Sequence, residues 1–173
     1  MNIIKKEEKM ETKNKIIKRM GVYHKITKGF YYASGVLCLV FIVLAIVLAC
    51  TNAISSLAVA ETACLFGTLA LYAFVCMGLL WNIASLFKSV EQEQAPFSQK
   101  VSHYLKKSAI FVILLATVPA LIGSLVLKII YPATELVFPV SLGGVIAGIA
   151  ILLVSIFFNY GKELQKNADE TLW

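Results

Sequence analysis

Four long apolar stretches alternate with polar stretches along this chain of 173 residues. They cover residues 33–50, 63–87, 109–127 and 138–158, and none of them contains Asp, Glu, Lys or Arg. A helix needs about 20 apolar residues to cross the hydrocarbon core of a bilayer, which is about 30 Å thick. Inside a bilayer the backbone has to satisfy its own polar groups, so such stretches form helices. We therefore predict an all-α protein with four transmembrane helices that pair as two antiparallel hairpins.

The polar stretches divide the chain into a basic tail at residues 1–29, a transmembrane domain at residues 30–158 with a polar loop at 88–108, and a charged tail at residues 159–173. In the first tail, apolar residues recur at helical spacing between lysines. This pattern fits a basic amphipathic helix that lies along an anionic membrane surface. It fits equally a solvated tail that only fixes the topology.

The distribution of positive charge predicts the orientation. Hydrophobic residues make up 59% of the chain and charged residues only 15%, whereas roughly a quarter of a soluble domain is charged. Of the 16 Lys and Arg residues, 15 lie in the two tails and the central loop, and Lys128 alone lies on the other side. Because Lys and Arg accumulate on the cytoplasmic side, we expect both termini and the loop there, with amphipathic helix extensions facing the anionic inner leaflet. The net charge of +6 is then a topology signal, and we expect no direct contact with nucleic acid.

Several kinds of chemistry have no support in this sequence. There is no zinc-binding helix motif, phosphate-binding loop or nucleophile elbow, and no Cys or His residues stand at metal-ligand spacing. The four spans hold no ionisable group of the kind that proton-coupled transport uses. We therefore expect a protein that is not an enzyme and that has no metal and no cofactor.

Three features of the spans suggest specific roles. Pro119, in the middle of the third span, lacks a backbone donor and is a candidate hinge or a packing feature. Gly144 and Gly148 form a GxxxG that brings another helix close, within this chain or in a homo-oligomer. Cys50 and Cys64 stand at the outer ends of the first two spans, where a disulfide would need Cα atoms within about 7 Å. The alternative for this pair is two free thiols.

The central loop carries a turn signal followed by a helix start. Pro96 disfavours helix in the residue before it, and Ser98 is a good N-cap. We therefore predict a turn followed by a helix that begins after Ser98 and runs through Lys106 and Lys107 into the third span.

Two short motifs resemble a known family. They are Ala-Pro-Phe-Ser at 95–98 and, after the fourth span, Tyr-Gly-Lys-Glu-Leu-Gln at 160–165 with Asp-Glu-Thr-Leu at 169–172. The chain resembles the small four-span bacterial membrane proteins known only as a domain of unknown function. It departs from that pattern at Gln94, where glycine is usual, and at Asn167, where an acid is usual. The resemblance implies no established activity, although such proteins are often encoded beside a Cro/CI-type helix-turn-helix regulator.

The short outer loops and the elaborated cytoplasmic face favour a binding or regulatory function. We expect a protein of the bacterial plasma membrane that binds a cytoplasmic partner, with the helix-turn-helix regulator as the partner that the resemblance implies. The alternatives are a small transporter or channel subunit and an immunity-type protein that shields the membrane from a peptide. The residues expected to dock the partner are Pro96, Phe97, Ser98, Lys106, Lys107, Tyr160, Gly161, Glu163 and Leu164.

Overall fold

The protein is helical throughout the part that the structure describes. The computed structural model describes residues 2–50, 57–93, 98–130, 132 and 141–171. These form α1 (Asn2–Cys50), α2 (Leu57–Glu93), α3 (Gln99–Ile130) and α4 (Leu142–Thr171). Each of the four helices contains a stretch that is long and apolar enough to cross a membrane. The predicted all-α fold with four membrane-length helices is therefore confirmed.

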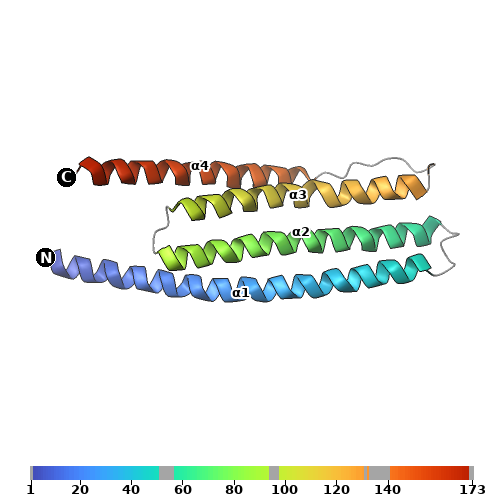
Figure 1. Ribbon diagram of the computed structural model, residues 1–173, viewed down its shortest axis with the longest axis horizontal. Helices are drawn as coiled ribbons and strands as arrows, with labels where there is room; N and C mark the ends of the chain where they lie inside the picture. Colours follow the sequence, from blue (N-terminus) through green and yellow to red (C-terminus); the bar gives the residue numbers. More distant parts are fainter. Residues whose placement is uncertain (1, 51–56, 94–97, 131, 133–140, 172–173) are drawn as a thin grey trace.

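The four helices lie in a row in the order of the sequence, and neighbouring helices run in opposite directions (Figure 1). Among the described residues, the backbone of α1 comes close only to that of α2, and the backbone of α4 only to that of α3. The row therefore leaves α1 and α4 as edge helices. Both chain termini lie at one end of the row (Figure 1). We call this end the polar end; its described residues are 15–28, 88–93, 98–107 and 159–167.

The basic tail continues the first span without a break. α1 starts at Asn2 and stays one helix to Cys50, because the sequence offers no proline or turn signal between tail and span. At Gly21 the helix lies beside α2, since a Cβ on Gly21 would lie 2.9 Å from a carboxylate oxygen of Glu91. The tail is helical and collinear with the span (Figure 1), and its position relative to a membrane surface stays a prediction.

The predicted polar loop at 88–108 is mostly helix. α2 runs on to Glu93, and α3 already begins at Gln99. Ser98 caps α3 as predicted, because its hydroxyl oxygen accepts a hydrogen bond from the Val101 N–H at 3.2 Å. The predicted single helix from Ser98 into the third span is therefore confirmed, whereas the length of the loop is wrong. Pro96 and Phe97 lie outside the described residues.

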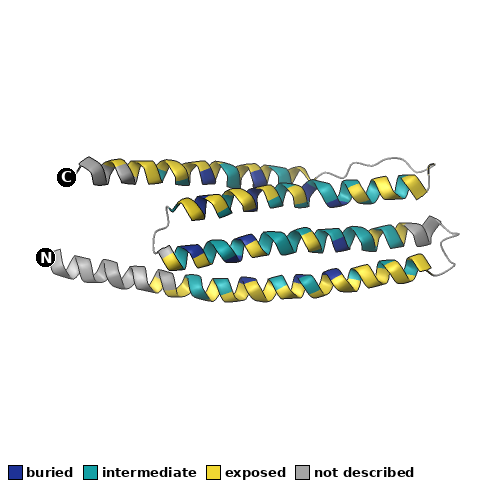
Figure 2. Ribbon diagram, viewed as in Figure 1, coloured by how far each residue is buried: buried dark blue, intermediate teal, exposed yellow. Residues whose placement is uncertain are grey.

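Few side chains are buried, and those that are buried are mainly small (Figure 2). In a membrane the apolar side chains that face away from the row meet lipid, so association depends on close packing and hydrogen bonds between helices. Small residues allow that close approach. The buried apolar residues are Cys38, Ala70, Ala84, Val101, Ala109 and Ala116.

Candidate functional site

Two serines join α3 and α4 near the polar end. The Ser102 hydroxyl donates to the Ser155 carbonyl at 3.2 Å, and the Ser155 hydroxyl donates to the Ser102 carbonyl at 3.0 Å. Both side chains are buried. Because both hydroxyls are buried, leaving either of them without its hydrogen-bond partner would cost free energy. The reciprocal pair therefore holds the two helices in one register.

Glycines bring the same two helices close along the rest of their contact. A Cβ on Gly148 would lie 3.1 Å from the Ala109 carbonyl oxygen and would also meet the Ile113 side chain. A Cβ on Gly144 would lie 2.6 Å from the Ala116 Cβ. In this structure the GxxxG pair thus faces α3 of the same chain.

α4 begins beside the middle of α3. The Ser141 N–H donates to the Ala116 carbonyl at 3.1 Å, and Ala116 lies 14 residues before the end of α3 at Ile130. At 1.5 Å per residue, α4 starts about 21 Å short of that end. The fourth apolar stretch was predicted to start at residue 138; α4 starts at Leu142, and residues 138–140 lie outside the described residues. Ser141 also caps α4, since its hydroxyl oxygen accepts from the Gly144 N–H at 3.3 Å.

Pro119 occupies a packed position in α3. Its side chain is fully buried, and α3 continues through it to Ile130. A proline disturbs the turn before it, and it is in this turn that the Ala116 carbonyl accepts the bond from Ser141. The proline thus lies next to the junction between α3 and the start of α4, and its role as a hinge stays a prediction.

The polar end brings together the two segments that carry the expected docking residues. The Lys162 Nζ donates to the Gln99 side-chain oxygen at 3.4 Å, so the end of α4 lies beside the start of α3. Lys106, Lys107 and the apolar side chains of Tyr160 and Leu164 are exposed. Ser98 and Gly161 are half-buried, Glu163 is exposed, and Pro96 and Phe97 cannot be placed because they lie outside the described residues.

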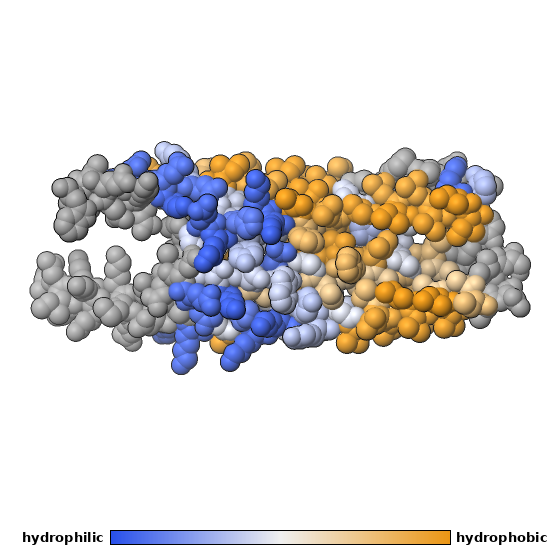
Figure 3. Space-filling model, in the orientation of Figure 1, coloured by the Kyte–Doolittle hydropathy of each residue, from blue (hydrophilic) through white to orange (hydrophobic). Residues whose placement is uncertain are grey.

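Positive charge gathers at the same end. Among the described residues, its basic side chains come from all four helices, and Figure 3 shows hydrophilic side chains over this half of the molecule and hydrophobic ones over the other. Toward the opposite end the described charged residues are Glu61 and Lys128. The basic residues of the polar end are Lys15, Lys18, Arg19, Lys25, Lys28, Lys88, Lys100, Lys106, Lys107 and Lys162.

Several part-buried polar contacts, two between helices and one within α2, are not apparent from the sequence. The Ser34 hydroxyl of α1 donates to the Ala73 carbonyl of α2 at 2.9 Å, and a His24 ring nitrogen lies 2.8 Å from the Ala84 carbonyl oxygen. Asn82 is buried and donates to the Gly78 carbonyl of its own helix at 2.8 Å. The available signal was the presence of Ser34 and Asn82 inside apolar runs, but the helix face on which each lies could not be assigned without a partner helix.

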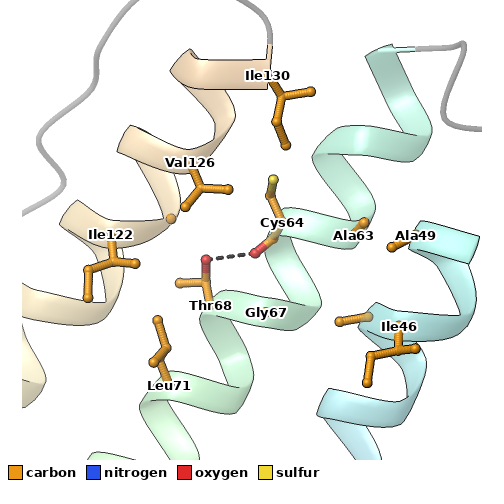
Figure 4. A pocket seen from close by; sticks show the side chains of 12 residues that line it. Ile46, Ala49, Ala63, Cys64, Gly67, Thr68, Leu71, Ile122, Val126 and Ile130 are labelled. Carbon is orange, nitrogen blue, oxygen red and sulfur yellow. Dashed lines mark hydrogen bonds between the residues drawn. The ribbon is translucent and has the colours of Figure 1, made fainter.

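A hollow lies between α1, α2 and α3 in the half of the molecule away from the polar end (Figure 4). Its volume is about 390 Å³. The Thr68 hydroxyl that borders it donates to the Cys64 carbonyl at 2.7 Å, so this hydroxyl is already satisfied. The lining is dominated by small or aliphatic residues: Ala45, Ile46, Ala49, Ala63, Cys64, Gly67, Thr68, Leu71, Ile122, Gly123, Val126 and Ile130.

The cysteines and other potential ligands form no reactive cluster in the described part of the chain. Cys50 and Cys64 are free thiols, as are Cys38 and Cys76. The described residues also contain no group of three His, Cys, Asp or Glu side chains that could hold a metal ion. The described residues instead form a basic surface at one end and an apolar hollow in the other half.

Neither the protein-family models, nor the curated proteins, nor the solved structures give a significant match to this chain. The family resemblance of its two short motifs therefore stays a prediction.

Proposed function

We propose that this chain is a multi-pass protein of the bacterial plasma membrane that binds a cytoplasmic protein through its polar end, without catalysing a reaction. The expected partner is a helix-turn-helix regulator. The four membrane-length helices support the membrane location. The concentration of Lys and Arg at the polar end supports a cytoplasmic position for it, with both termini inside.

The observation that carries this proposal is the joining of two distant segments into one surface. Lys162 bonds to Gln99 across 3.4 Å, and Ser102 and Ser155 fix the helices behind them. Exposed Lys106 and Lys107 lie about two turns along α3 from Gln99. A cytoplasmic protein would therefore meet residues of both segments, with lysines that attract an acidic surface.

The test is co-purification of the full chain in detergent with a helix-turn-helix regulator of the Cro/CI type encoded in the same genome. Binding by the native chain, reduced at least tenfold in the variant Lys106→Glu/Lys107→Glu, would support the proposal. The matched control is Lys18→Glu/Lys25→Glu on α1, which changes the net charge equally on the opposite edge of the row. No binding by the native chain, or equal loss in both variants, would count against docking at α3 and α4.

A second candidate function is transport of an apolar or amphipathic solute, and the hollow between α1, α2 and α3 favours it. Its volume of about 390 Å³ falls in the range of roughly 300–1,000 Å³ that small-molecule sites occupy. The test is solute flux into liposomes that contain the chain. If the flux of apolar cations and of lipids equals that of empty vesicles, transport is excluded as the function.

A further inference from the structure

The Ser108 hydroxyl of α3 is a buried polar group that has no hydrogen-bond partner among the described residues. The Ser108 side chain is only 5% exposed. A buried hydroxyl without a partner costs free energy, and most buried polar groups in folded proteins bond either to another protein group or to an ordered water. The position of Ser108 between the helices shows which of these partners it can have.

Ser108 lies on the face of α3 that packs against α2. The Phe111 ring lies against Gly78 of α2, since a Cβ on Gly78 would lie 2.5 Å from a ring carbon of Phe111. Ser108 comes three positions before Phe111 on α3, and Asn82 comes four positions after Gly78 on α2. Both spacings keep residues on one helix face. Because the two helices are antiparallel (Figure 1), both steps run toward the polar end.

Ser108 and Asn82 therefore lie on facing sides at nearly the same level. The step from Phe111 to Ser108 covers about 4.5 Å, and the step from Gly78 to Asn82 covers about 6 Å. Asn82 is also buried, with 8% of the residue exposed. The contact between α2 and α3 thus contains two buried polar side chains at one level, within a part of the chain that is otherwise mainly apolar.

The two side chains have complementary hydrogen-bonding groups. The Asn82 amide nitrogen donates to the Gly78 carbonyl at 2.8 Å, and the amide oxygen is an acceptor. The Ser108 hydroxyl can donate and accept. Because this hydroxyl has no partner, it does not bond directly to Asn82. A molecule that joins the two groups has to be small and able both to donate and to accept.

We propose that one water molecule binds in the contact between α2 and α3 and bridges the Ser108 hydroxyl and the Asn82 amide oxygen. A buried water needs two to four polar partners, and these two side chains supply the minimum. Ser108 directly follows Lys107 in the sequence, and basic residues mark the membrane boundary. The site therefore lies close to the boundary at the polar end, from which water can enter.

The bridge gives the contact between α2 and α3 a polar link of the kind found in the other two contacts. Ser34 of α1 donates to a carbonyl of α2, and Ser102 and Ser155 join α3 to α4. Thr68 of α2 and Ser124 of α3, by contrast, each donate to a carbonyl of their own helix. The water thus joins the pair of helices that carries the docking surface to the rest of the row.

A double-mutant cycle in mixed detergent micelles tests the bridge. Ser108→Ala should lower the equilibrium constant of folding roughly threefold, the mean effect of a hydrogen bond between membrane helices. In a chain with Asn82→Leu, Ser108→Ala should leave this constant unchanged or raise it, because the bridge is already lost. The matched control is Ser124→Ala, which should have the same effect in both backgrounds, since Ser124 bonds within α3 to the Leu121 carbonyl.

A crystal structure of the full chain that resolves ordered water gives the second test. It should show a water about 2.5–3.0 Å from the Ser108 oxygen and from the Asn82 amide oxygen. A direct bond between these side chains, or a Ser108 hydroxyl that donates to the Tyr104 carbonyl of its own helix, would overturn the proposal. So would a Ser108→Ala chain that is at least as stable as the native one, because its hydroxyl then had no partner to lose. Regulator binding is measured separately through Lys106 and Lys107, so either proposal can fail while the other stands.

Discussion

Gly148 in the contact between α3 and α4 and Gly67 beside the hollow on α2 show that a small residue can have opposite effects. Gly148 faces the backbone of Ala109, with 3.1 Å between the position of its missing Cβ and the carbonyl oxygen. Gly67, by contrast, has no atom within 4 Å of that position and borders a hollow of about 390 Å³. A small residue thus brings two helices together where atoms of the opposite helix occupy the space of its missing side chain, as Ala109 and Ile113 do at Gly148. At Gly67 the missing side chain leaves open space instead. The contact between α3 and α4 is therefore closely packed, whereas the hollow has room for a ligand.

The largest expected effect comes from filling the close contact. Gly148→Leu places a side chain against Ala109 and Ile113 and should destabilise the fold by about 1–3 kcal/mol, as overpacking does. Unfolding in mixed detergent micelles measures this change. Gly143→Leu is the control, because nothing lies within 4 Å of its Cβ position and its effect should be small. An equal loss of stability in the two variants would show that α3 and α4 do not meet at Gly148.

The cap at the start of α4 should have the next largest effect. Ser141→Ala removes the oxygen that accepts the Gly144 N–H and should cost about 1 kcal/mol, the usual value for a lost N-cap. Ser124→Ala removes a hydroxyl that bonds only within α3, to the Leu121 carbonyl, and should cost less. A stability of Ser141→Ala equal to that of the native chain would contradict a helix start at this point.

The serine pair should give a smaller but specific coupling. In a double-mutant cycle of Ser102→Ala and Ser155→Ala, we expect a coupling free energy of about 0.6–1.7 kcal/mol, between the mean and the maximum measured for hydrogen bonds between membrane helices. The same cycle with Ser85→Ala in place of Ser102→Ala should show no coupling, since Ser85 bonds to the Trp81 carbonyl of its own helix. Comparable coupling in both cycles would mean that the first value does not report a direct contact.

Filling the hollow should change stability least. Gly67→Leu projects into open space, so the free energy of unfolding should shift by no more than about 0.5 kcal/mol. The new side chain should slow alkylation of Cys64, measured in a chain where Cys64 is the sole thiol, by a small membrane-permeant maleimide. Gly143→Leu should leave the alkylation rate unchanged. Unaltered alkylation in Gly67→Leu would show that the thiol is not reached through the hollow.

The sequence predicts the parts of the fold that depend on contact with lipid or water. Runs without charge predict the four membrane-length helices, and Ser98 predicts the start of α3. The sequence does not predict that the basic tail continues α1, that α2 extends to Glu93 or that α4 starts beside Ala116. Hydropathy distinguishes apolar segments from segments that face water, but it does not distinguish an apolar face that meets lipid from one that packs against a helix. An apolar face packs against another helix only where the two surfaces match in shape, as at Gly148 and Ala109. Such matching surfaces lie in segments that are distant along the chain.

The candidate site shows the same limit. The lysines and the two motifs predicted a basic end with residues for docking, because charge and turn signals are local. The hollow beside Cys64 was missed, since it exists only where small residues of three helices face one another. The register between α3 and α4 was missed as well, since it depends on the contact between Ser102 and Ser155.

The register between α3 and α4 is the central claim, because the joined surface at the polar end depends on it. In a chain without native cysteines, Ser102→Cys/Ser155→Cys should form an intramolecular disulfide on mild oxidation in membranes. Ala109→Cys/Ser155→Cys, displaced by one heptad or about 10.5 Å along α3, should not. Efficient crosslinking of the second pair and none of the first would contradict the account and would place α4 two turns further from the polar end.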